Sequence, residues 1–200
     1  MRLNIFYILL IALCGLYGCK NHQQPIIKEN LNILPTIYPE YQGALLPVNI
    51  APLNFSLKDS MEDAQVVLSY SDQRIEVKSK DNQFVFPTSK WKRLLSSAAG
   101  NEVEVVVRVK EKGKWLEYAP VKWSVAAEPV DPYIAYRLIA PGYTLWNKMG
   151  LYQRDLESYT ETPIIENKMS GRNCVNCHSF CMQNPDKMLF HMRETFPGTI

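Results

Sequence analysis

The segment 102–110 alternates polar and apolar residues almost strictly, with the sequence EVEVVVRVK. Because successive side chains of a strand point to opposite faces of a sheet, this pattern predicts a half-buried β-strand. Residues 111–114 predict a turn, and residues 115–125 predict a long returning strand. The odd-numbered valines of the first strand should face the core. Val106 breaks the alternation, so part of this strand is expected to be buried on both faces.

Further short elements surround this long hairpin. Residues 64–70 and 74–78 predict two strands joined by a turn, and residues 83–86 predict a strand that ends at Pro87. Residues 89–99 predict a short helix, with Ser89 as its N-cap. The pattern indicates a mainly β fold with an immunoglobulin-like β-sandwich over residues 49–127. Its predicted core includes Val105, Val107, Val109, Trp115 and Trp123.

The remaining segments are assigned by composition and spacing. Residues 19–48 are interpreted as a lipid anchor and tether, polar at first, whose last part, residues 35–48 with three prolines, is expected to run extended into the fold. Residues 128–170 are interpreted as a connector, with a strand at 133–139 and a helix at 145–156. Residues 171–200 are expected to form a small irregular or helical segment, and residues from about 165 onward are expected to pack loosely or to present an unpaired edge.

The N-terminus has the features of an export signal. Residues 1–18 contain a basic start at Arg2 and an apolar run that is too short to span a membrane. The run ends in Leu-Tyr-Gly-Cys, which resembles the lipobox of bacterial lipoproteins. That resemblance implies a diacylated Cys19 in the cell envelope, facing the periplasm or the exterior. An uncleaved anchor or an ordinary secretory signal would also export the chain.

Composition excludes several function classes. The formal net charge is +2 with 22 basic and 20 acidic residues, and no block of Lys or Arg stands out. Nucleic-acid binding is therefore not expected. The sequence contains no nucleophile–base pair, phosphate loop or paired carboxylates that stand out, so the chain is not expected to be an enzyme.

Three cysteines lie close together near the C-terminus, within the sequence Cys174-Val-Asn-Cys177-His178-Ser-Phe-Cys181. Cys-x-x-Cys-His is the attachment sequence of c-type haem. Its two thiols can form thioethers to one porphyrin, and the adjacent imidazole can ligate the iron. Export agrees with this interpretation, because c-type haem is attached outside the cytoplasm. We therefore expect a haem c on Cys174 and Cys177, with His178 as the proximal iron ligand.

Other interpretations of this cluster stay open. Cys174, Cys177, His178 and Cys181 could bind Zn²⁺, although four ligands within eight residues leave little room for a tetrahedron. The cysteines could form a disulfide or a redox pair, although no thioredoxin-like pattern surrounds them. The motif could also carry no cofactor.

Residues 173–180 and 184–193, with 49–55 and 140–150 upstream, also resemble a family of exported lipoproteins described as cytochrome c-like. In that family a TolB-like β-propeller follows the haem-type motif. Here the sequence stops at Ile200, where the first propeller strand would begin, so we expect a chain truncated before its propeller. The resemblance carries over only the haem-attachment roles of Cys174, Cys177 and His178.

The sixth iron position has several candidate ligands, of which His191 is favoured as the only other histidine beyond the tether. The alternatives are water, Met182, Met188 and Met192. The expected function is one-electron transfer or redox sensing, with a redox partner protein. The alternative is a non-enzymatic binding lipoprotein with structural or metal-binding cysteines.

Overall fold

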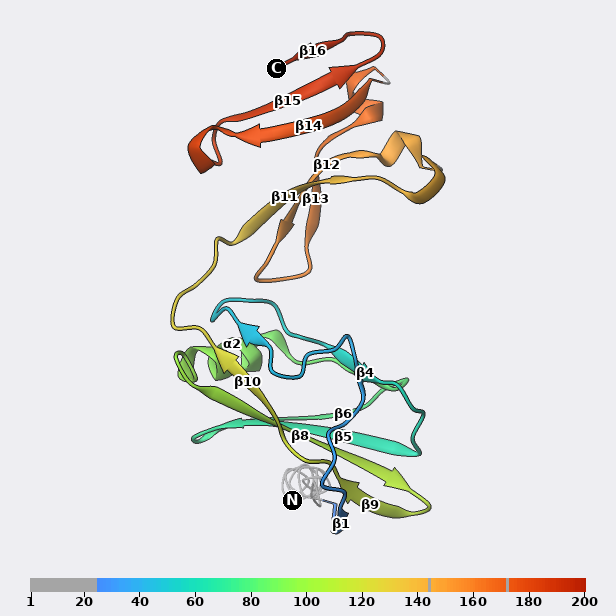
Figure 1. Ribbon diagram of the computed structural model, residues 1–200, viewed down its shortest axis with the longest axis vertical. Coiled ribbons are helices and arrows are strands. Elements are labelled where there is room, and N and C mark those ends of the chain that lie inside the picture. The colour runs from blue at the N-terminus through green and yellow to red at the C-terminus, as the bar shows by residue number, and fades with distance from the viewer. Residues whose placement is uncertain (1–24, 144, 172) are drawn as a thin grey trace, which may run out of the picture.

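The computed structural model describes residues 25–143, 145–171 and 173–200. Within them the protein is mainly β, with four sheets and one short α-helix, as the alternating pattern predicted. Figure 1 shows an elongated arrangement. Two sheets and the helix form a unit at one end, a three-stranded sheet lies in the middle, and another three-stranded sheet lies at the opposite end.

The largest sheet has seven strands arranged around β8 (Glu102–Glu111). β5 lies on one side of β8, with β6 beyond it. β9 and β10 lie on the other side and continue the sheet to β1 and β3. The bounds of these six strands are β1 Ile27–Asn30, β3 Leu45–Leu46, β5 Asp63–Tyr70, β6 Gln73–Lys78, β9 Lys114–Glu117 and β10 Val121–Val125.

A smaller sheet and the helix close the other side of the core. The sheet contains β2 (Ile37–Tyr38), β4 (Phe55–Leu57) and β7 (Gln83–Phe84), and α2 (Thr88–Ser97) follows β7. The two sheets and α2 bury one continuous hydrophobic cluster. Each buried tryptophan also satisfies its indole N–H, since Trp91 donates to the Ile50 carbonyl and Trp123 to the Tyr41 carbonyl, both at 2.8 Å.

The predicted register of β8 is confirmed. Its four odd-numbered valines, from Val103 to Val109, are at most 1% exposed, whereas Glu104 is exposed. Val106 is half-buried on the opposite face, where the alternation breaks. Among the other predicted core residues Trp123 is fully buried, but Trp115 is only half-buried because β9 lies beside the marginal strand β1.

Residues 35–48 run extended into the fold as expected, since they contain β2 and β3, and Ile37 and Leu46 are core residues. Two predicted boundaries in this unit were wrong. The unit begins before Asn49, because β1 also belongs to its largest sheet. Hydrogen bonding to β9 and β10 recruits strands that are too short to show an alternation of their own. The helix begins at Thr88 after Pro87, without a side-chain cap from Ser89.

The returning strand expected at 115–125 is two strands, β9 and β10. The interruption contains Pro120, which has no backbone N–H to donate to a sheet. The Tyr118 N–H donates to the Val107 carbonyl at 3.0 Å, and the Ala119 N–H donates to the Ile33 carbonyl at 2.9 Å. After the interruption the chain pairs with β8 again, so β9 lies beside one end of β8 and β10 beside the other.

The middle sheet has the order β11–β12–β13. Its strands are β11 (Tyr133–Leu138), which the sequence predicted, β12 (Gly150–Asp155) and β13 (Glu161–Glu166). The helix expected at 145–156 was wrong. That segment forms only the 3₁₀ turn η2 (Trp146–Lys148) before β12, because β12 is hydrogen-bonded to a strand on each side. Two further 3₁₀ turns are η1 (Pro141–Tyr143) and η3 (Asn167–Ser170).

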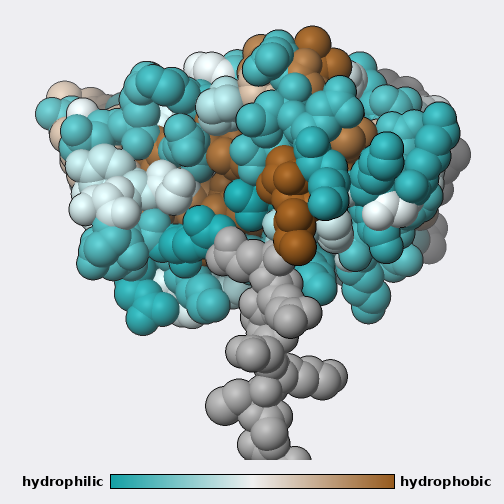
Figure 2. Space-filling model, turned by 90° about the horizontal axis from the view of Figure 1, so that it is seen from below, coloured by the Kyte–Doolittle hydropathy of each residue, from teal (hydrophilic) through white to brown (hydrophobic). Residues whose placement is uncertain are grey.

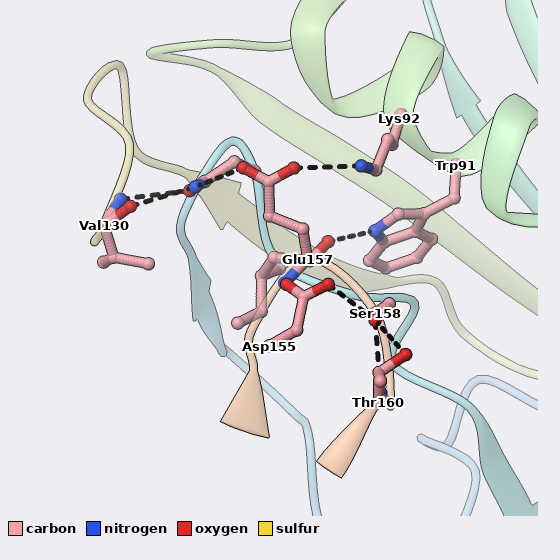
Figure 3. Close-up of polar contacts among 9 residues, drawn as sticks. Trp91, Lys92, Val130, Asp155, Glu157, Ser158 and Thr160 are labelled. Carbon is pink, nitrogen blue, oxygen red and sulfur yellow. Dashed lines mark hydrogen bonds and ion pairs between the residues drawn. The ribbon is translucent and has the colours of Figure 1, made fainter. Parts of the chain in front are cut away.

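A polar junction joins the middle sheet to the two-sheet unit (Figure 3). The Asn49 side-chain amide donates to the Val130 carbonyl and accepts the Val130 N–H, and its nitrogen also donates to Glu157 at 3.1 Å. Lys92 of α2 forms an ion pair with Glu157 at 3.0 Å. These bonds to Asn49 and Lys92 lower the pKa of the Glu157 carboxyl. The junction therefore ties the β12–β13 turn to the core-forming part of the chain.

The C-terminal sheet has the order β14–β15–β16, with bounds Cys174–Phe180, Met188–Arg193 and Gly198–Thr199, and the turn η4 (Cys181–Gln183) follows β14. The expected irregular or helical segment is thus mostly strand. Among the described residues from Ile165 onward, only Glu166, Asn167, Asn173 and Val175 are buried. This low burial agrees with the expected loose packing.

Candidate functional site at the Cys-x-x-Cys-His strand

The Cys-x-x-Cys-His motif lies within β14, paired antiparallel to β15. Val175 pairs with Met192 and His178 pairs with Phe190, so three steps along β14 match two along β15. One extra residue, a β-bulge, therefore lies between them, at Asn176 and Cys177.

The bulge decides which side chains share a face. Val175 and His178 are both paired with same-face residues of β15, so they lie on one face of the sheet. Cys174 and Cys177 lie on the opposite face, because alternation holds on either side of the bulge. Exposure agrees with this assignment, since Val175 is buried and Cys177 is exposed.

The three cysteines of the cluster are free thiols. Cys174 is half-buried, whereas Cys177 and Cys181 are exposed. The Arg137 side chain of β11 donates from Nη2 to the Cys174 Sγ at 3.5 Å, and its Nε is buried without a hydrogen-bond partner. This contact with a guanidinium gives Cys174 a different environment from the two exposed thiols.

His178 lines a cavity of about 590 Å³ between the middle sheet and the C-terminal sheet. This volume lies in the range of small-molecule and cofactor pockets. The cavity wall combines aromatic and aliphatic side chains with polar ones, and the His178 ring meets the Phe180 ring edge-on at 6.3 Å. The apolar part includes Tyr133, Ile134, Ile164, Phe180 and Met188, and the polar part includes Asp131, Gln153, Ser179 and Gln183.

His191 does not join His178 at this cavity. It alternates to the opposite face of β15 from Phe190, the partner of His178, and its Nδ1 lies 3.1 Å from the Thr199 Oγ1. Met188 is the candidate sixth ligand that lines the cavity with His178. Met182 is 94% exposed. The structure therefore brings His178 together with Met188 rather than with the favoured His191.

Two buried asparagines hold β14 in position, and sequence reasoning missed both. The Asn167 Oδ1 accepts the Val175 N–H at 3.0 Å, while its amide nitrogen donates to the Trp146 carbonyl at 3.1 Å. The Asn173 Oδ1 accepts the Phe196 N–H at 2.7 Å. An isolated asparagine has no periodic signal, so only the tertiary contacts reveal these roles.

Tyr152 of β12 and Glu166 of β13 form a buried phenol–carboxylate pair in the middle sheet. The Tyr152 hydroxyl lies 2.7 Å from the Glu166 Oε1 and 2.6 Å from the Lys148 carbonyl. Burial, together with the Glu166 carboxylate, raises the pKa of Tyr152 to about 12. Hydrogen bonds from Lys168 and Tyr152 lower the pKa of the Glu166 carboxyl. The pair is thus a neutral phenol and a charged carboxylate near pH 7.

A zinc site built from the motif is not assembled in this conformation. Among the described residues, no three His, Cys, Asp or Glu side chains are grouped closely enough to hold a metal ion. The alternation along β14 explains this for the motif, since Cys177 and His178 point to opposite faces.

A c-type haem can be tested against the same geometry. The donor types fit, because two free thiols and an imidazole occur together and the imidazole borders a partly apolar cavity. The strand conformation does not fit, because a doubly attached haem needs all three side chains at one porphyrin. Cys174 and Cys177 lie on the face of β14 opposite His178, so attachment requires residues 174–178 to leave the strand.

Compared with known proteins, the chain matches no family model, no curated protein and no solved structure. Within the described residues, none of the helices has the length and apolarity to cross a bilayer. The predicted signal peptide at 1–18 and the predicted lipid on Cys19 lie outside the described residues.

Proposed function

We propose that this chain is an exported, lipid-anchored, cytochrome c-like protein that binds one haem c. The observation that carries the proposal is the intact Cys174-x-x-Cys177-His178 set, whose imidazole borders a cavity of about 590 Å³. Cys174 and Cys177 would hold the haem by thioethers and His178 would be its axial ligand. The haem would supply one-electron transfer or redox sensing, and no substrate turnover is proposed.

The protein's own residues have a defined part in this proposal. Tyr133, Ile134 and Phe180 would cover an apolar group and exclude water from it. Attachment requires residues 174–178 to form a turn. The bulge makes this change easier, because the ladder is already irregular between Val175 and His178.

The arrangement along the long axis supports a role in the cell envelope. β1, the first described strand, lies at the end of the molecule opposite β14–β16 (Figure 1). A lipid on Cys19 would anchor the β1 end. The haem would then lie far from the anchor, accessible to a redox partner protein in the periplasm or at the cell exterior.

The test is expression of the exported protein in a host that attaches c-type haem. We expect haem staining that survives denaturing electrophoresis and a haem absorption spectrum for the native protein. Cys177→Ala should abolish the covalent stain. Cys181→Ala is the matched control and should retain it, because Cys181 lies outside the motif. A wild-type protein that never stains in a competent host would overturn the proposal.

The second candidate is a non-enzymatic binding lipoprotein that uses the cavity without its cysteines. It is favoured by the separation of the thiols from His178 across β14. A hydrophobic dye such as anilinonaphthalene sulfonate is a suitable probe. This candidate predicts weaker dye binding in Phe180→Ala and unchanged binding in Cys174→Ala/Cys177→Ala. Dye binding unaffected by Phe180→Ala would reject the cavity as the binding site.

A further inference from the structure

The segment from Ile26 to Leu34 presents apolar side chains to solvent from an ordered backbone. Ile26 is 74% exposed, Ile33 59% and Leu34 48%. Figure 2 views this end of the molecule and shows hydrophobic atoms beside the point where the described chain emerges from a mainly hydrophilic surface. Ile26 precedes β1, and Ile33 and Leu34 follow it, so the exposed apolar side chains lie along this edge segment. Such side chains indicate an interaction surface when a partner can reach them.

The backbone of this segment is held in place by the two-sheet unit. β1 pairs with β9 in parallel, with Ile27 opposite Trp115 and Glu29 opposite Leu116, and one irregularity lies between these two pairs. Beyond β1, the Leu31 N–H donates to the Glu117 carbonyl and the Ile33 carbonyl accepts from Ala119, both at 2.9 Å. The apolar side chains are therefore displayed by a fixed edge of the sheet.

The short stretch of chain between the predicted lipid on Cys19 and Ile26 indicates which partner can reach these side chains. Six residues, 20–25, separate Cys19 from Ile26. The Cα atoms of Cys19 and Ile26 are seven residue steps apart, so even a fully extended chain separates them by no more than about 25 Å. If Cys19 is inserted in a membrane by its acyl chains, Ile26 lies within reach of the headgroup region. The surface that can always reach the exposed side chains is then the bilayer itself.

We propose that Ile26, Ile33 and Leu34 contact the phospholipid surface and orient the protein on the membrane. This inference rests on the proposed lipid at Cys19. Apolar contact carries the inference, because it rests on the exposed side chains of Ile26, Ile33 and Leu34 and not on the lysines of the neighbouring β8–β9 hairpin. Contact should therefore be similar on phosphatidylcholine vesicles and on vesicles that contain phosphatidylglycerol.

Hydrogen exchange measured by mass spectrometry tests the proposal. The lipidated protein on phosphatidylcholine vesicles is compared with a Cys19→Ser form made without residues 1–18 and kept in solution. Peptides covering 26–34 should exchange more slowly on vesicles. Ile26→Asn/Ile33→Asn should lose that protection while its melting temperature stays close to that of the wild type. Val85→Asn is the matched control, because Val85 is 60% exposed and follows β7 instead.

The outcomes separate the inference from the proposed function. The mass of the N-terminal peptide reports lipidation independently, and an unmodified Cys19 overturns both. A lipidated protein with equal exchange on vesicles and in solution overturns the surface contact alone. Protection that is already present in the soluble Cys19→Ser form would mean that the chain's own N-terminal residues cover these side chains, which also rejects the bilayer.

Discussion

The side-chain oxygen of Asn167 lies 3.0 Å from the backbone nitrogen of Val175 and accepts its hydrogen bond in the protein interior. Asn167 is fully buried after β13, and Val175 is the second residue of the motif strand β14. One amide thus links the middle sheet to the strand that carries the cysteines.

Asn167→Ala should destabilise the C-terminal sheet. The substitution leaves the buried Val175 N–H and the Trp146 carbonyl without their side-chain partner, at a cost of about 1–3 kcal/mol. Urea unfolding, followed by hydrogen exchange in β14 and β15, measures this loss. Asn184→Ala is the control, because Asn184 is exposed and its side chain accepts the N–H of the neighbouring Asp186. Equal unfolding midpoints for both variants would count against the proposed link.

Gly150→Ala should disrupt the middle sheet by a steric contact. An added Cβ at Gly150 would lie 2.1 Å from the Ile165 carbonyl oxygen and 2.7 Å from the Glu166 Cα, both of which are backbone atoms that cannot turn aside. The expected loss is about 2 kcal/mol or more, in the range of overpacked sites. Thermal unfolding measures it. Gly198→Ala, which meets open space, should melt close to the wild type.

Tyr152→Phe should change the alkaline stability of the protein. Because the folded-state pKa of Tyr152 is raised from 10.0 to about 12, its stabilising effect is complete below pH 10 and is lost as the pH rises towards 12. Phenylalanine cannot ionise, so the difference in melting temperature between the two proteins should shrink from pH 9 to pH 12. A difference that stays constant over this range would show that Tyr152 does not titrate as the structure requires.

Thiol labelling should report the register of β14 in the haem-free protein. Cys177 and Cys181 are exposed and Cys174 is half-buried, so brief treatment with iodoacetamide should label Cys177 and Cys181 first. Peptide mass spectrometry identifies the labelled residues. In denaturant all three cysteines should react at similar rates. Native protein in which Cys177 is protected would mean that the bulge and its face assignment are wrong.

Sequence reasoning located the strands whose own residues alternate between polar and apolar. Alternation from Val103 to Val109 predicted the most buried strand and its register, because a period of two leaves one face to bury. The segment around Leu151 was misassigned, since its apolar spacing also suits a helix. The segment forms the strand β12 because it is hydrogen-bonded to β11 on one side and to β13 on the other.

The Cys-x-x-Cys-His set and the lipobox-like Cys19 are visible in the sequence because their chemistry depends on residue type and local spacing. The faces on which Cys174, Cys177 and His178 lie depend on one extra residue opposite His191, which only strand pairing reveals. The cavity wall from Tyr133 and Ile134, the Arg137–Cys174 contact and the Asn167 link also join residues far apart in the chain. Local sequence therefore determined which donor groups are present, while long-range hydrogen bonding and packing decided which of them meet.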